Sequence, residues 1–301
     1  MSEALRIPAP AAQGPGALPR PAVDRLALGV ARRAAGVLNG ATPAPGQGDG
    51  TELEQLRPYQ HGDDVRWLDP AASARTGVPH VRRYVPERAL TTWIVLDVSP
   101  SMAWGTAQRL KSDVAAGAAQ VLADLGVRHA GQVGLVACGG PEPVVLPPRG
   151  GRAALVALQR HVAAGVVPDG AGRPDALADG LRRLGAIARR PGLVAVVSDL
   201  PHDAELRRPL AALAERHTVL AVEVRDPREL ALPPVRRLAL VDPETGEHAE
   251  VDVDDGVRER FAARVAGERR EVRDLLRRLG ALHVVLSTDA AWLPDLARRL
   301  T

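Results

Sequence analysis

The chain has 301 residues, 46% hydrophobic and 25% charged, which is enough to bury a core in one large domain or two ordinary ones. Aromatic residues make up only 2%, so the core must be built from aliphatic side chains. The 39 basic and 36 acidic residues leave a formal net charge of +3, an excess too small to favour a nucleic-acid-binding protein.

Cysteine content and hydropathy exclude two further classes. The single cysteine, Cys138, rules out an intrachain disulfide or a cysteine-based zinc cluster within one chain, and its apolar surroundings predict a core residue. No stretch reaches the roughly 20 apolar residues that a membrane helix needs. The N-terminus lacks the basic and apolar blocks of a signal peptide. We therefore expect a cytoplasmic protein without a membrane span.

The first 90 residues divide into a tail and a segment. Residues 1–20, rich in Ala, Pro and Gly, are predicted to be a disordered tail. Apolar residues at helical spacing predict a short helix over 21–38, followed by a glycine-rich loop at 39–50. A polar block and an extended stretch starting at His80 complete an N-terminal segment, 21–90, before the main domain at 91–301.

The main domain alternates apolar strands with amphipathic helices. Strands are expected at 91–96, 133–138, 143–146, 193–197, 218–224 and 282–286. Helices are expected around 114–125, 155–162, 177–187, 206–213 and 257–279 and from about 290, with a hairpin at 238–253. This alternation is typical of an α/β fold with a doubly wound, mostly parallel sheet and helices on both faces.

A metal-binding pattern follows the first of these strands, in Asp97-Val-Ser-Pro-Ser101. Because residues two apart in extended chain project to the same side, Asp97, Ser99 and Ser101 can offer a carboxylate and two hydroxyls to one point. Such hard oxygen donors suit Mg²⁺ or another divalent cation better than zinc or copper. Asp199 ends a second buried strand and can reach the same edge, where doubly wound folds bind ligands. Alternatively, Asp97 and Ser99 only cap the following turn.

The segment 97–101 resembles the first part of the metal-ion-dependent adhesion site in von Willebrand factor A-like domains. The upstream segments 57–69, 73–77 and 81–87 resemble the signature of a bacterial family of unknown function, domain-of-unknown-function family fifty-eight. The Asp242-Pro-Glu-Thr-Gly-Glu turn and the Leu286-Ser-Thr-Asp segment are similar to that family too. The resemblance covers about residues 23–300.

The resemblance implies a non-enzymatic binding and assembly module that works with a MoxR-type AAA+ ATPase in protein maturation or remodelling. In related adhesion sites an acidic side chain of the partner completes the coordination of the cation. The family pattern also places a threonine on a middle loop, here 168–175, which contains none and has Pro174 at that place. Asp169 and Asp175 are the candidates to replace it. The predicted metal ligands are Asp97, Ser99, Ser101, Asp199 and Asp175.

The polar block upstream is a candidate partner surface. Its predicted partner-binding residues are Gly62, Asp63, Asp64, Arg66, Asp69 and Arg75. The alternative is a salt-bridged turn that fastens the N-terminal segment to the main domain. His202 lies three residues after Asp199 and is expected to be a solvated loop histidine.

An enzyme remains the alternative function, as a metal-dependent hydrolase or phosphatase using Asp97 or Ser99. Haloacid-dehalogenase-type phosphatases resemble the chain in having an aspartate after a buried strand, but they carry a second carboxylate where this chain has Ser99. The only lysine, Lys111, lies in the first helix of the domain. Ser99 lacks a nucleophile elbow, and no phosphate-binding Gly-x-x-x-x-Gly-Lys loop is present. We therefore expect a protein that is not an enzyme and binds no nucleic acid.

Overall fold

The computed structural model describes residues 53–300 except 62, 85–89 and 129–130. The tail, helix and loop predicted within 1–50 lie outside the described residues. Contacts divide the chain into two compact units, one within 39–89 and one that contains residues 90–300, and each is described by itself. Among the described residues, no helix combines the length and the apolar character needed to cross a membrane.

The small unit is an antiparallel pair of strands, β1 (Leu53–Pro58) and β2 (His80–Tyr84), joined by a short helical segment. That segment contains the 3-10 turn η1 (Val65–Trp67) and helix α2 (Pro70–Thr76). Helix α2 begins where the Asp69 carboxylate accepts the amide hydrogen of Ala72, and it ends at Gly77, whose φ of 75° strongly favours glycine. Asp69 of the polar block therefore serves to begin helix α2.

The large unit contains a six-stranded sheet with the order β10-β7-β6-β3-β4-β5. Its strands are β3 (Thr91–Asp97), β4 (Gln132–Cys138), β5 (Val144–Gly150), β6 (Leu193–Ser198), β7 (Thr218–Arg225) and β10 (Leu282–Ser287). Neighbours are parallel except for β5, which runs antiparallel at one edge with a register shift between Val133 and Leu135 of β4. The prediction of an α/β fold with a mostly parallel sheet is confirmed.

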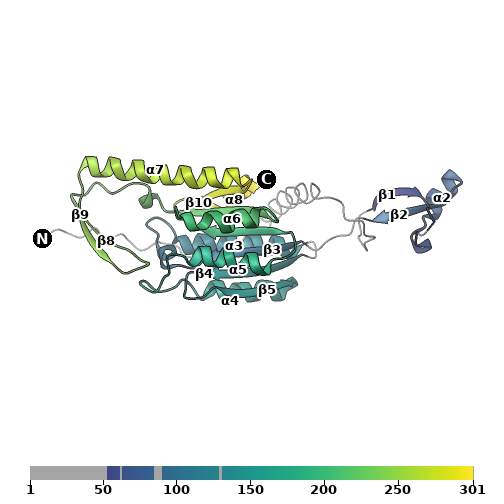
Figure 1. Cartoon of the computed structure of the whole chain (residues 1–301), viewed down its shortest axis with the longest axis horizontal. Coiled ribbons are helices and arrows are strands. Elements are labelled where there is room, and N and C mark those ends of the chain that lie inside the picture. Colours follow the sequence, from purple (N-terminus) through teal and green to yellow (C-terminus); the bar gives the residue numbers. More distant parts are fainter. Residues whose placement is uncertain (1–52, 62, 85–89, 129–130, 301) are drawn as a thin grey trace. The chain divides into compact units, whose positions relative to one another are not determined.

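Helices cover both faces of this sheet (Figure 1). One face carries α3 (Lys111–Val127), α4 (Gly151–Ala163) and α8 (Trp292–Leu300), and the other carries α5 (Ala176–Ile187), α6 (Arg207–Ala214) and α7 (Asp255–Arg278). Successive residues of β3 supply both cores, because Ile94 packs with the first set of helices and Val95 with the second. Both side chains are fully buried.

The carboxyl ends of β3, β6 and β7 lie side by side because these strands are parallel neighbours. They lead into the turns η2 (Pro100–Ala103), η4 (Ala204–Leu206) and η5 (Pro227–Glu229). The hairpin of β8 (Arg237–Val241) and β9 (His248–Asp252) precedes α7, as the sequence predicted. Gly139, after β4, allows close packing here, since a Cβ at this position would lie 2.4 Å from the Ser99 backbone nitrogen.

Candidate metal centre

The carboxylate of Asp97, the last residue of β3, accepts hydrogen bonds from serine hydroxyl groups around it. Its Oδ1 accepts hydrogen bonds from the Ser99 amide at 2.9 Å and the Ser99 hydroxyl at 2.6 Å. The Ser99 and Ser101 hydroxyl oxygens lie 3.1 Å apart, so the three predicted ligands of this loop form one cluster. The other carboxylate oxygen accepts a hydrogen bond from Ser198 Oγ at 2.6 Å, because β3 and β6 are adjacent and in register.

The electrostatics of Asp97 favour a cation. Its side chain is buried, and this burial, together with the charge of Asp199, raises its pKa from 3.8 to about 6. Its hydrogen-bond partners are hydroxyls and a backbone amide, and no basic side chain in the described part of the chain pairs with it. A divalent ion at this point would stabilise the charged carboxylate.

Asp199 is held by a buried lysine that the sequence analysis did not include in the site. Lys111 Nζ lies 2.8 Å from Asp199 Oδ2 and also pairs with Glu229 of η5, while the lysine side chain is only 1% exposed. Burial alone would lower the pKa of Lys111, but the charges of Asp199 and Glu229 raise it above its usual value. One signal was present in the sequence: Lys111 is the only lysine among 39 basic residues.

The turn after Asp199 has a strained backbone, and hydrogen bonds from α7 hold it in place. Leu200 has a φ of 48°, a left-handed conformation that is rare for a bulky residue. Arg269 from α7 donates from Nη1 to the carbonyl oxygens of Asp199 at 2.8 Å and of Leu200 at 3.3 Å. The same guanidinium bonds the fully buried carboxylate of Glu223 at 2.8 Å. The position of Asp199 therefore depends on α7 as well as on β6.

A second carboxylate enters the cluster from the β8–β9 hairpin. Glu244 Oε1 accepts a hydrogen bond from the Ser101 amide at 3.0 Å. Its other oxygen, Oε2, is buried and has no hydrogen-bond partner among the described residues. The predicted Asp242–Glu247 turn was the only sequence signal for this residue, and nothing in it indicated contact with a loop 143 residues away.

The middle loop, 168–175, brings neither of its aspartates into contact with Asp97. Asp175 occupies the N-cap position of α5, is exposed, and makes no capping hydrogen bond with its side chain. Asp169 is exposed as well. Among the described residues, no hydrogen bond or ion pair joins either carboxylate to Asp97, and no group of three or more His, Cys, Asp or Glu side chains is arranged to hold a metal. The oxygen donors that do converge are mostly serine hydroxyls.

Four of the predicted partner-binding residues form bonds inside the small unit, and Gly62 lies outside the described residues. Asp63 forms a two-pronged ion pair with Arg57 at 2.7 and 2.8 Å. Asp64 caps η1 and pairs with Arg66, while Asp69 caps α2 and pairs with Arg82 at 2.8 Å. Arg75 is exposed in the last turn of α2.

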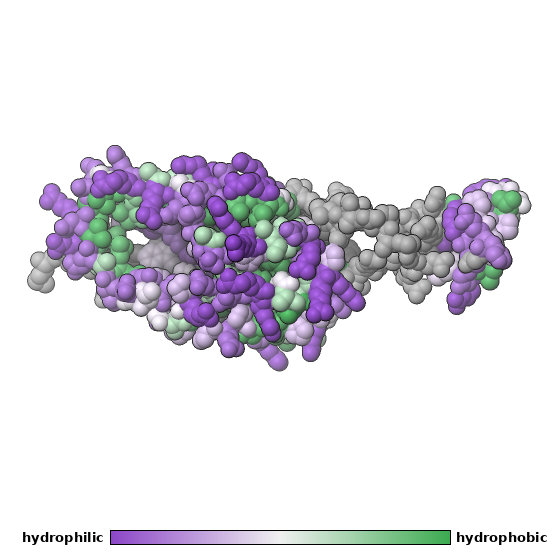
Figure 2. All heavy atoms as spheres, in the orientation of Figure 1, coloured by the Kyte–Doolittle hydropathy of each residue, from purple (hydrophilic) through white to green (hydrophobic). Residues whose placement is uncertain are grey.

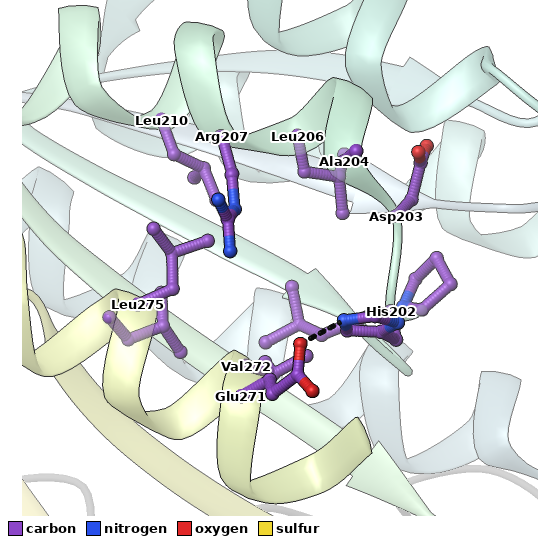
Figure 3. A pocket seen from close by; sticks show the side chains of 12 residues that line it. His202, Asp203, Ala204, Leu206, Arg207, Leu210, Glu271, Val272 and Leu275 are labelled. Carbon is purple, nitrogen blue, oxygen red and sulfur yellow. Dashed lines mark hydrogen bonds and ion pairs between the residues drawn. The ribbon is translucent and has the colours of Figure 1, made fainter. Parts of the chain in front are cut away.

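A separate pocket of about 260 Å³ lies between η4, α6 and α7 (Figure 3). Leucine and valine side chains line its inner part, among them Leu206, Leu210 and Val272. His202 Nε2 lies 2.8 Å from Glu271 Oε2. His202 is therefore a partly exposed loop histidine with an ionic partner, and it belongs to this pocket.

The strand order, the antiparallel edge strand and the loop after β3 define the class of protein as a von Willebrand factor A-like α/β module. A family model described as "Protein of unknown function DUF58" matches residues 55–271, and the chain belongs to that family.

Curated relatives include "Uncharacterized protein Mb1516" of Mycobacterium bovis and "Uncharacterized protein Rv1480" of Mycobacterium tuberculosis. Each is 37% identical over 278 residues, which is 92% of this chain and 87% of the relative. Similar solved structures include the conserved hypothetical protein BatB from Bacteroides thetaiotaomicron, with a TM-score of 0.43, 13% identity, and coverage of 70% of this chain and 97% of that one. The SpRpn10 VWA domain gives a TM-score of 0.41 with 14% identity, covering 70% and 95%.

Proposed function

We propose that the chain is a non-enzymatic protein-binding module whose recognition site is a divalent cation, Mg²⁺ or a similar ion. The single observation that carries the proposal is the buried Asp97 carboxylate, which has two serine hydroxyls converging beside it and no cationic partner among the described residues. Asp97, Ser99 and Ser101 would hold the ion, and Asp199 would contribute from the next strand. The ion supplies a positive charge that an acidic group of a partner can bind.

The orphaned oxygen of Glu244 supports the fit of these residues to a cation. A buried carboxylate oxygen without a partner costs about 1–3 kcal/mol or more, and a metal ion beside it removes that cost. The donors are carboxylate and hydroxyl oxygens, the ligands that Mg²⁺ prefers over zinc or copper.

The partner that we propose is a MoxR-type AAA+ ATPase, acting with this chain on a client protein. This part rests on the family resemblance of the sequence motifs, and it assigns the chain an adaptor role in protein maturation or remodelling.

Titration calorimetry with Mg²⁺ and with Mn²⁺ tests the cation. Wild-type protein should take up one ion, Asp97→Ala should take up none, and Asp169→Ala, which removes an exposed carboxylate of the middle loop, should bind as the wild type does. Unchanged uptake in Asp97→Ala would remove Asp97 from the site.

Co-purification with the ATPase, with and without a chelator, tests the partner. Loss of the ATPase from the purified complex in the presence of the chelator supports recognition through the metal. Co-purification that the chelator does not change would mean that the interface lies elsewhere. Turnover of a phosphate ester that disappears in Asp97→Asn would overturn the non-enzymatic proposal.

A further inference from the structure

We infer that Glu244 is a ligand supplied by the chain itself, which closes the cation site with the tip of the β8–β9 hairpin until an acidic group of a partner replaces it. This inference rests on the proposed function. In this proposal Glu244, at the hairpin tip, occupies the place beside the loop at 97–101 that a partner carboxylate would take. Partner binding is then a competition between the Glu244 carboxylate and the partner carboxylate for one ion.

The first support is the direct contact with the serine loop. Glu244 Oε1 accepts the Ser101 amide hydrogen at 3.0 Å, and the Ser101 hydroxyl lies 3.1 Å from that of Ser99, which in turn donates to Asp97 at 2.6 Å. These bonds form one continuous path from the hairpin to the end of β3. Glu244 therefore joins the oxygen cluster although it lies far away in the sequence.

The second support is the unpaired oxygen. Glu244 Oε2 is buried without a hydrogen-bond partner among the described residues, while Oε1 is satisfied by Ser101. Burial removes the hydration of this oxygen, and no hydrogen bond replaces the lost water. Coordination of a cation by Oε2 provides the missing interaction, because carboxylate oxygens are strong ligands for Mg²⁺ and Ca²⁺.

The third support is the composition of the middle loop. A Cβ at Gly172 would lie 1.9 Å from Glu244 Oε2 and 2.9 Å from Pro100 Cδ, so any other residue there would collide with the carboxylate. Loop 168–175 has no threonine to offer as a ligand, and at Gly172 it leaves the space that Glu244 fills. The hairpin thus supplies an oxygen donor beside the loop from which a hydroxyl is missing.

The fourth support is that the hairpin is weakly fastened at its tip. Within the described residues, the tip is joined to the rest of the unit by hydrogen bonds from the Gly170 amide to the Pro243 carbonyl at 2.9 Å and from the Ser101 amide to Glu244. A two-stranded hairpin is at best marginally stable by itself. Leu240 and Val241 are exposed on β8, and Figure 2 shows hydrophobic surface over the hairpin that a displacing partner can cover.

Calorimetry on the full chain with Mg²⁺ alone as the probe tests the ligand role. Glu244→Gln keeps the shape of the side chain and should weaken Mg²⁺ affinity about tenfold or more, by comparison with the loss of supporting groups at other metal sites. Glu247→Gln removes the same charge from an exposed position of the same turn and should leave the affinity within about twofold of the wild type.

Glu244→Ala in acetate buffer tests the exchange of carboxylates. Acetate should restore most of the lost Mg²⁺ affinity in this variant and should not raise the affinity of the wild type. In metal-free protein, amide hydrogen exchange at Ser101 should be faster in Glu244→Ala than in Glu247→Ala, with melting temperatures confirming that both variants fold.

The outcomes separate the two proposals. Metal uptake by wild type with equal affinity in Glu244→Gln would overturn the role of Glu244 and leave the cation site standing. No uptake by wild type would overturn both. Affinity lost in Glu244→Ala without rescue by acetate would overturn the exchange of carboxylates.

Discussion

Replacing Asp97 by asparagine should stabilise the metal-free protein at neutral and mildly alkaline pH. The folded-state pKa of Asp97 is raised from 3.8 to about 6, mainly by burial and then by the charge of Asp199. Because one pKa unit corresponds to about 1.4 kcal/mol, holding this carboxylate charged costs the folded state up to about 3 kcal/mol. Asparagine has the same shape and does not ionise, so it avoids that cost.

The pH dependence follows from the direction of this shift. A carboxyl group whose pKa is higher in the folded state binds its proton more tightly there. Its contribution to stability is complete below the unfolded value near pH 4 and is lost as the pH rises through about 6. The advantage of Asp97→Asn should therefore be largest above about pH 7 and should disappear near pH 4.

The local hydrogen bonds can accommodate the amide. An asparagine oxygen can still accept from the Ser99 amide and hydroxyl. The amide hydrogens would face Ser198, whose hydroxyl can turn toward Asp199 Oδ1, 3.5 Å away. The bond from Ser198 is lost, and the two bonds from Ser99 become bonds to a neutral amide oxygen.

Urea unfolding in a chelator, at pH values from about 4 to 8, measures the effect. With Mg²⁺ in excess the order should reverse, since the wild type gains binding free energy and Asp97→Asn does not. A variant that is less stable than the wild type at pH 8 in chelator would refute the argument that the charge at this position is unfavourable in the apo protein.

Two further predictions concern the surroundings of the site. Lys111→Met should lower the free energy of unfolding by about 3–5 kcal/mol, because it leaves two carboxylates facing each other without their buried cation; denaturant titration checks this, and a loss below about 1 kcal/mol would contradict it. Gly172→Ala should displace the Glu244 carboxylate and therefore weaken Mg²⁺ binding in calorimetry. The control is Gly185→Ala, which lies in α5 with open space around it; this variant should leave Mg²⁺ binding unchanged and stabilise the fold by up to about 1 kcal/mol. Equal Mg²⁺ affinity in the two alanine variants would show that Gly172 has no part in the site.

The large unit was predictable from sequence because its signals are local. Continuous apolar strands such as 193–197 and amphipathic helices such as 177–187 lie where the hydrophobic pattern put them. Helix α2 was not predicted, since it is one short element within a polar block and depends on a cap at Asp69. The Asp97, Ser99 and Ser101 cluster was predictable because its three members lie within the short segment 97–101, although Ser101 lies in the 3-10 turn η2 and not in the extended chain predicted from the sequence.

The rest of the candidate site depends on contacts between distant segments. Lys111 was assigned to the first helix of the domain, and only the fold shows that its side chain is buried against Asp199 and Glu229. Buried lysines are rare, so composition alone argues against such a position. Glu244 reaches Ser101 across 143 residues through a hairpin whose own pattern specifies only its two strands. Asp175 stays a predicted ligand, exposed at the start of α5.

The edge strand β5 limits how other chains can attach to this sheet. Pro147 and Pro148 lie within β5 and have no amide hydrogens to donate, and they coincide with the register shift opposite β4. A foreign strand that extended the sheet along this rim would lose a hydrogen bond there, because one of two successive strand residues directs its amide outward, and proline on an edge strand is a common protection against aggregation. Recognition along this rim must therefore use side chains rather than main-chain pairing.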